Sequence, residues 1–279
     1  MPYKFQPNRM YRMPTHFGPA CGPRQGPDGS RFPGETSHDL INVSVRFLSN
    51  REQLEALLPG GGGLALDGEP VVNVFAQYMK QIDWLAGRGY NVVGVTIPVV
   101  FHGKRDHAVG NFMIVLWENL TDPILTGRDE LGAPKIYGEI PDPVMYGGKT
   151  SCTASWLGFR FFDMTVQGMK QLSLQEAAAL PNQRRVDGTI WYKYIPKTGD
   201  WGKPDVTYVT LCPAAGPIVQ KEYWQGEGKL QFHHARWEDM PTQFNIVNGL
   251  AELEIKEYRG ATIVKSIGQG DLRDTRILE

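Results

Sequence analysis

The chain has 279 residues, a length that allows one large β-rich domain or two small ones. Hydrophobic residues make up 41% of it and charged residues 21%, so we expect a packed core and exclude disorder over most of the chain. The 29 basic and 30 acidic residues give a formal net charge of -1, which argues against binding to nucleic acid or to an anionic membrane surface. We therefore expect the partner to be a small molecule or another copy of the chain.

The cysteines and the opening segment indicate the cellular compartment. Cys21, Cys152 and Cys212 are widely separated and have no CxxC spacing, so neither a disulfide framework nor a zinc site is predicted. The chain starts without an apolar leader segment, and no later stretch approaches ~18 uninterrupted apolar residues. We expect a cytoplasmic protein with reduced, mostly buried thiols.

Residues 1–38 form a segment of unusual composition, with seven prolines and five glycines. Such a segment cannot form a regular helix or strand, so we expect an extended arm. Its aromatic residues favour docking onto the rest of the protein. From about residue 40 the pattern becomes regular, and we predict a single domain over residues 39–279.

Two short helices are predicted from capping signals. In residues 49–59, Ser49 and Glu52 have the spacing of a capping box and Pro59 ends the helix. The stretch "SLQEAAALP" repeats the pattern with Ser173 and Glu176, and Pro181 ends it.

The remaining segments read mostly as β-strands, because they are rich in β-branched and aromatic residues and lie between Gly, Pro, Asn or Asp. They are 40–48, 90–103, 111–119, 153–166, 189–196, 205–213, 228–234 and 250–258. In the last of these, apolar Ala251, Leu253 and Ile255 alternate with charged residues, which is typical of a strand with one buried face. The predicted class is mainly β with a few helices (α+β), arranged as a largely antiparallel β-barrel or cone enclosing an apolar cavity.

Lys135 stands in the stretch "LGAPKIYGE", directly after a proline. A lysine that forms a Schiff base must be neutral, whereas a free lysine has a pKa of ~10.4, so the amine must be desolvated or lie near another cation. Pro134 restricts the backbone, and Ile136 with Tyr137 can supply an apolar wall. By spacing alone, an exposed lysine at the start of a strand is the simpler reading.

A family resemblance changes this balance. "GRDELGAPKIYGE", together with "TIPVVFHG" and "DPIL", resembles the core signature of the acetoacetate decarboxylase family, whose Schiff-base lysine follows a proline. "TIWYKYIPKTGDWGKPDVTYVTL" and "GKLQFHHARWEDMP" resemble later segments of the family, so the likeness covers roughly residues 40–258. It implies an antiparallel β-barrel or cone with a central apolar cavity, usually in oligomers, and Lys135 as the catalytic amine.

The chain also departs from that family. Members that decarboxylate acetoacetate carry a second lysine directly after the first, and Ile136 stands there. The family's two glutamates fall near Val92 and Val74, and its arginine falls near Leu40. Activation by a neighbouring cation is therefore lost in its usual form, and desolvation must replace it. The pattern resembles divergent members, some of which use the lysine for aldol condensation and dehydration with pyruvate.

Other polar residues are candidates for substrate binding or proton transfer. Arg128 can hold a substrate carboxylate or act as a buried strut, and Arg24 in the arm can reach over the cavity mouth. Glu118 and Glu139, with Asp122, are acids near Lys135 in the sequence and are the candidates for acid or base.

Aromatic residues and histidines complete the candidates. Tyr78 and Trp117 can line the cavity, although core packing is the usual role of aromatics on strands. The histidines lack the spacing of a cupin-like metal site, so no metal and no cofactor are expected; they are His102, His107, His233 and His234.

Two classes of function remain open. The first is a Schiff-base-forming lyase that acts on a keto acid through Lys135 and makes or breaks a carbon–carbon bond. The second is a non-catalytic β-barrel that binds a small molecule.

Overall fold

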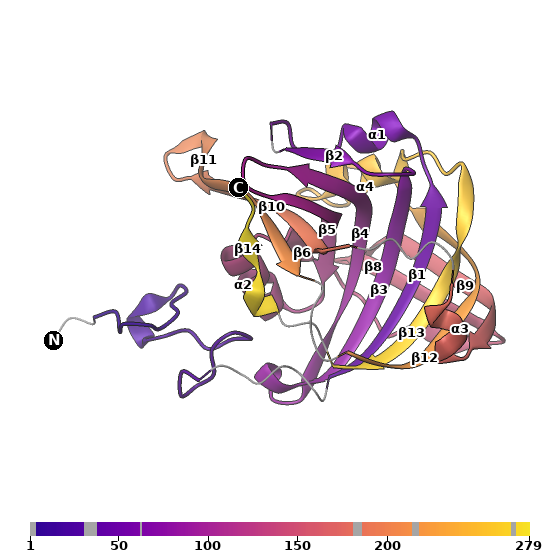
Figure 1. Ribbon diagram of the computed structural model, residues 1–279, viewed down its shortest axis with the longest axis horizontal. Helices are drawn as coiled ribbons and strands as arrows, with labels where there is room; N and C mark the ends of the chain where they lie inside the picture. Colours follow the sequence, from indigo (N-terminus) through magenta and orange to yellow (C-terminus); the bar gives the residue numbers. More distant parts are fainter. Residues whose placement is uncertain (1–3, 31–37, 62, 181–185, 214–217, 269–271) are drawn as a thin grey trace.

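The computed structural model describes residues 4–30, 38–61, 63–180, 186–213, 218–268 and 272–279 (Figure 1). The strands are β1 (Asp39–Leu48), β2 (Leu64–Leu66), β3 (Val71–Ile82), β4 (Arg88–His102), β5 (His107–Glu118), β6 (Lys135–Tyr137), β7 (Val144–Tyr146), β8 (Lys149–Trp156), β9 (Phe159–Leu172), β10 (Gly188–Lys197), β11 (Asp200–Pro213), β12 (Val219–Phe232), β13 (Glu257–Ile267) and β14 (Arg276–Ile277). The helices are α1 (Arg51–Glu55), α2 (Thr121–Thr126), α3 (Leu174–Ala178) and α4 (Phe244–Ala251), and a π-helical turn (Gly127–Leu131) follows α2.

All strands belong to one sheet in the order β14-β11-β10-β5-β4-β3-β1-β13-β12-β9-β8-β7, with β2 on β4 and β6 on β5. The pairings are antiparallel except β5 with β10 and β5 with β6, which are parallel. The predicted class, mainly β with a few helices, is confirmed. In the described part of the chain the two end strands do not pair, so the sheet is curved and open. Closure needs full-length strands at the seam, and β14 and β7 have only two and three residues.

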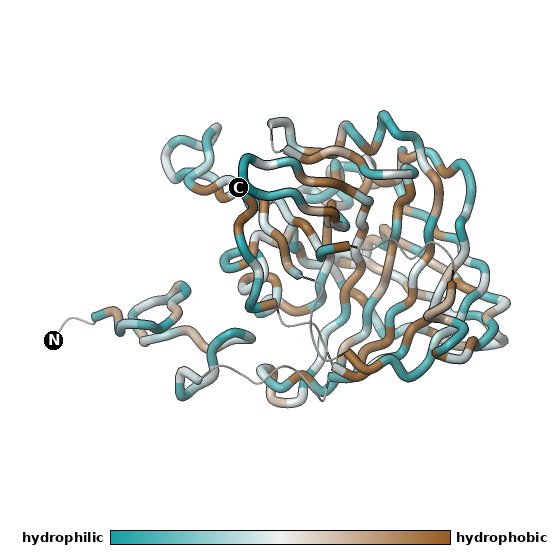
Figure 2. The backbone as a smooth tube through the Cα atoms, viewed as in Figure 1, coloured by the Kyte–Doolittle hydropathy of each residue, from teal (hydrophilic) through white to brown (hydrophobic). Residues whose placement is uncertain are grey.

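The curvature of the sheet brings its two halves together around the main core. Trp117 on β5 lies with its ring centroid 4.9 Å from that of Phe161 on β9 and 6.2 Å from that of Phe232 on β12. Valines on β1, β3 and β4 are buried in the same cluster. Figure 2 shows the hydrophobic residues concentrated along these strands and the hydrophilic ones along the arm and the loops.

A second apolar cluster packs on the opposite face of the same strands. It contains Phe75, Met79, Val92, Leu116 and Trp191. Successive residues of a strand point to opposite faces, so Leu116 and Glu118 share this second face whereas Trp117 points into the main core. The sheet is therefore buried on both faces around β5.

The signals predicted for the ends of the two short helices have different outcomes. The capping box of Ser173 and Glu176 is confirmed at α3. At α1 the capping residue is Asn50, whose side chain accepts from the backbone N–H groups of Glu52 and Gln53, so the predicted Ser49 cap is wrong. Pro181 lies outside the described residues.

The predicted strand over 250–258 is also wrong. Residues 244–251 form helix α4, and β13 begins only at Glu257. Apolar Val247 and Leu250 are buried with helical spacing, and this pattern overrides the alternation that follows it.

Cys152 and Cys212 are buried free thiols and Cys21 is exposed. No helix in the described ranges has the length and apolar character needed to span a membrane.

Candidate active site

Lys135 begins the short strand β6, which pairs in parallel with β5 so that Lys135 lies beside Leu116. Its side chain points to the face of the second apolar cluster and the residue is 7% exposed. The expected apolar wall is not formed by its sequence neighbours. Ile136 points to the other face, and Tyr137 is 40% exposed.

The amine of Lys135 has two oxygen neighbours. Its Nζ lies 2.9 Å from Oε1 of Glu118, and it donates to the backbone carbonyl of Pro123 at 3.1 Å. Pro123 belongs to α2, a helix that the sequence analysis did not predict. The next turn presents Gly127, where a Cβ atom would lie 2.8 Å from Nζ and closer still to Cδ and Cε. Glycine is therefore required at this position for the lysine to fit.

Glu118 is the charged partner of Lys135 and is more deeply buried, at 1% exposure. Burial raises the pKa of the Glu118 carboxyl above its usual range, and the nearby Lys135 opposes this with a smaller lowering effect. Oε2 of Glu118 is buried and has no hydrogen-bond partner among the described residues. The site thus contains a buried carboxyl and a buried amine whose nearest atoms lie 2.9 Å apart.

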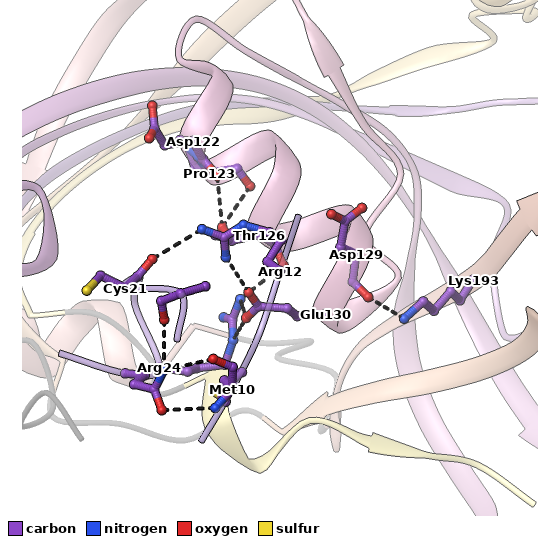
Figure 3. Close-up of polar contacts among 12 residues, drawn as sticks. Met10, Arg12, Cys21, Arg24, Asp122, Pro123, Thr126, Asp129, Glu130 and Lys193 are labelled. Carbon is purple, nitrogen blue, oxygen red and sulfur yellow. Dashed lines mark hydrogen bonds and ion pairs between the residues drawn. The ribbon is translucent and has the colours of Figure 1, made fainter. Parts of the chain in front are cut away.

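Arg24 and Arg12 hold the arm to the body (Figure 3). Arg24 Nε donates to Glu130 Oε2 at 2.5 Å, and Arg12 Nη1 donates to Glu130 Oε1 at 2.7 Å. Arg24 Nη2 also donates to the carbonyl of Thr126 at 3.0 Å. Because Glu130 belongs to the turn after α2, both arginines fasten the arm to the segment that carries Gly127. Arg24 is thereby occupied by Glu130 and is not directed at the Lys135 amine.

Arg128 donates from Nη1 to the backbone carbonyl of Lys135 at 2.9 Å. It lines a pocket of about 320 Å³ together with Pro134, Ile136 and residues of α4. This pocket lies on the reverse side of β6 from the amine. Arg128 therefore positions the Lys135 backbone, and the structure pairs it with neither Asp129 nor Glu130.

Tyr78 and Trp117 do not join Lys135. Both point into the main core, on the opposite face of the sheet, with exposures of 2% and 0%. Trp117 Nε1 donates to Gln243 Oε1 at 2.7 Å, and burial raises the pKa of Tyr78 above its usual range. Strand alternation explains why Trp117 lies apart from Lys135: residues 116 and 118 share the face of the lysine, and residue 117 points to the other face.

The remaining acids are also apart from the amine. The backbone of Glu139 bridges to Ser155, with Glu139 N donating to Ser155 O at 2.7 Å, and the side chain is partly buried. Asp122 is exposed on α2. Among the described residues neither has a contact with Lys135. Of the three candidate acids, Glu118 is the one that the structure places against Lys135.

The candidate histidines do not gather at one site. The rings of His102 and His107 lie 4.9 Å apart, whereas His233 Nε2 lies 2.6 Å from Asp163 Oδ2. Over the described ranges no three His, Cys, Asp or Glu side chains gather as a metal site would require.

Sequence reasoning missed Gly127, Lys193 and Trp191. Lys193 is buried on β10 and its Nζ donates to the Asp129 carbonyl at 2.6 Å, which fixes the turn before Lys135 (Figure 3). Trp191, two residues earlier, belongs to the second apolar cluster. The only sequence signal for these two was their place in the segment "TIWYKYIP".

The comparisons with known proteins identify the family of the chain. The family model described as acetoacetate decarboxylase (ADC) matches residues 12–276. The chain therefore belongs to the acetoacetate decarboxylase family, as the sequence motifs indicated. No match was found among curated proteins.

Solved structures of enzymes share the fold. Acetoacetate decarboxylase from Legionella pneumophila subsp. pneumophila str. Philadelphia 1 has a TM-score of 0.66 and 16% identity over 91% of this chain and 92% of that chain. The enduracididine biosynthesis enzyme MppR complexed with pyruvate has a TM-score of 0.64 and 16% identity over 92% and 98%. An acetoacetate decarboxylase-like enzyme from Sphingomonas wittichii RW1 has a TM-score of 0.61 and 20% identity over 90% and 96%.

Proposed function

We propose that this protein is an enzyme that forms a Schiff base between Lys135 and a keto acid, with Glu118 as the group that gives and takes protons. One observation carries the proposal: a buried amine lies 2.9 Å from a buried carboxylate on an apolar face of the sheet. Membership of the acetoacetate decarboxylase family supports it.

The pair can activate the amine without a neighbouring cation. Burial raises the pKa of Glu118, which favours the neutral acid. When the proton moves from Nζ to Oε1, the pair becomes a neutral amine and a neutral carboxylic acid. The first is the nucleophile that Schiff-base formation requires, and the second is the acid that dehydration requires.

The reaction then follows from these two groups. Nζ of Lys135 attacks the substrate carbonyl carbon, and the electron pair of the C=O bond moves to oxygen. A proton then moves from Nζ to that oxygen, which gives the carbinolamine. The carbinolamine loses its hydroxyl as water with the proton from Glu118, which leaves an iminium on Lys135 and a carboxylate on Glu118. The iminium nitrogen accepts an electron pair released at the carbon next to the iminium carbon. This pair comes from the bond to carbon dioxide when a 3-keto acid decarboxylates, or from a C–H bond when a 2-keto acid loses a proton, which Glu118 can accept.

The departures from the family pattern narrow the range of substrates that we propose. Ile136 replaces the second lysine of members that decarboxylate acetoacetate, and Val92, which pairs with Glu118, stands where a family glutamate is expected. The structure of MppR complexed with pyruvate is a precedent for a keto acid on this fold. We therefore favour carbon–carbon bond making or breaking on a 2- or 3-keto acid other than acetoacetate.

Reductive trapping tests the proposal. The protein is incubated with a panel of 2- and 3-keto acids and borohydride, and its intact mass is measured. We expect the substrate's mass to be added with loss of water and gain of two hydrogens, mapped to Lys135. Lys135→Ala and Lys135→Arg should abolish the adduct, because guanidinium is not nucleophilic at pH 7.

Lys265→Gln is the matched control, since Nζ of Lys265 also lies 2.9 Å from a carboxylate, that of Glu222, but both side chains are partly exposed and lie on β13 and β12. It should retain the adduct. Binding of a keto acid without any adduct would favour the non-catalytic binding protein. An adduct that survives in Lys135→Ala would refute the role of Lys135.

A further inference from the structure

Trp191 is a buried tryptophan whose indole N–H lacks a hydrogen-bond acceptor among the residues that the structure describes. The residue is 5% exposed, and its Nε1 has no hydrogen-bond partner within the described ranges. Trp117 and Trp224, by contrast, donate to Gln243 and Glu222 at 2.7 and 2.9 Å. A buried donor without an acceptor is costly, so few occur in native proteins and each calls for an explanation.

Trp191 belongs to the surroundings of the Lys135 site. It is paired on β11 with Thr210, whose hydroxyl donates to the carbonyl of Leu131 at 2.9 Å. Gly132 packs against Lys193, so β10 lies directly on the turn that precedes Lys135. Trp191 shares one apolar cluster with Leu131, Ala133 and Leu116. The indole N–H and the Lys135–Glu118 pair therefore lie on the same face of the sheet.

The chemistry of the adduct decides what this donor can bind. When a keto acid becomes an iminium its carbonyl oxygen leaves as water, so its carboxylate oxygens are the acceptors that remain. The indole N–H is a donor only. Arg24 is held by Glu130 and the Thr126 carbonyl, Arg128 by the Lys135 carbonyl and Lys193 by the Asp129 carbonyl, so each of these cations already has a partner within the protein.

We infer that Nε1–H of Trp191 donates a hydrogen bond to the carboxylate of the substrate bound on Lys135, and that this substrate carries an apolar substituent. The inference rests on the proposed function and adds the substrate class. A single neutral donor binds a carboxylate less strongly than a guanidinium fork, so apolar contacts must supply the remaining affinity. The cluster offers such contacts through Phe75, Met79 and Val92.

The test compares two buried tryptophans with three compounds. Trp191→Phe removes an unpaired donor, whereas Trp117→Phe removes a paired donor on the opposite face. The compounds are 2-oxo-4-phenylbutanoate, the ketone 4-phenyl-2-butanone, which lacks the carboxylate, and pyruvate, which lacks the apolar group. Half-saturating concentrations for reductive trapping are measured, together with Tm.

For Trp191→Phe we expect half-saturation by 2-oxo-4-phenylbutanoate to rise about tenfold or more, as for loss of a hydrogen bond to a charged group. Half-saturation by the ketone should change less than about twofold, because the bond to the carboxylate is absent. Tm should stay the same or rise. Trp117→Phe should lower Tm, since Gln243 loses its donor, and leave both half-saturation values unchanged.

Equal effects of Trp191→Phe on the keto acid and the ketone, or no effect on either, would overturn the role of Trp191. Trapping of pyruvate at concentrations as low as those for 2-oxo-4-phenylbutanoate would overturn the apolar substrate class. Absence of any adduct in the unmodified protein, with all three compounds, would instead remove the proposed function.

Discussion

Removal of the Lys135 amine should make the stability of the protein depend steeply on pH. Lys135→Met keeps an apolar side chain of similar length and leaves Glu118 with no positive partner at 1% exposure. A buried carboxylate that loses its partner costs about 3–5 kcal/mol if it stays charged. The alternative is that it takes up a proton.

The size and sign of the effect follow from the buried carboxyl. Burial raises the pKa of Glu118, and Lys135, which lowers it, is gone in the variant. The folded carboxyl then keeps a proton that the unfolded chain loses above a pKa of about 4.3. Stability from this group is present below that pH and is lost as pH rises, by about 1.4 kcal/mol per unit. Between pH 5 and 7.5 the loss is therefore at most about 3–4 kcal/mol, the limit for a carboxyl that keeps its proton over the whole interval.

Urea unfolding of Lys135→Met and of Lys135→Met with Glu118→Gln, at fixed protein concentration and several pH values, measures this effect. The difference in unfolding free energy between the two variants should grow with pH, because the amide does not titrate. The other carboxyls cancel in this difference. A difference that stays flat from pH 5 to 7.5 would show that Glu118 is solvated in the folded protein and would refute the argument from burial.

Gly127→Ala should displace Lys135 and lower the trapping rate on the order of 10²-fold, whereas Gly249→Ala, whose Cβ meets nothing within 4 Å in helix α4, should leave trapping unchanged and stabilise the protein by about 0.5–1 kcal/mol. Equal trapping by the two variants would count against this packing. Glu130→Ala should release the arm and speed tryptic cleavage within residues 4–30, which a gel time course measures; an unchanged rate would show other anchors. Carbon dioxide release from acetoacetate should be slow or absent because Ile136 replaces the second lysine, and turnover at the usual enzyme rates of about 1 to 10³ per second would contradict this.

The local sequence determined the features that depend on neighbouring residues. Alternating β-branched and aromatic residues predict most strands, and Ser173 with Glu176 predicts the cap of α3, because these preferences act within one element. The motif around Lys135 identified the family and the candidate nucleophile. The Pro- and Gly-rich composition of residues 1–38 predicts a segment without strands, and between residues 4 and 30 the structure has only a short 3-10 turn and an isolated bridge.

Only the tertiary structure decided which side chains meet Lys135. A period of two shows that Glu118 and Trp117 point to opposite faces, but both faces of β5 are buried, so the sequence alone does not tell which one bears the amine. The choice depends on the parallel register of β6 on β5, a long-range pairing that no local preference encodes. Two further contacts also depend on long-range pairing. Arg24 donates a hydrogen bond to Glu130, 106 residues away, and Trp191 packs in one cluster with Leu131 of the turn before Lys135. These contacts form only when distant segments of the chain are brought together.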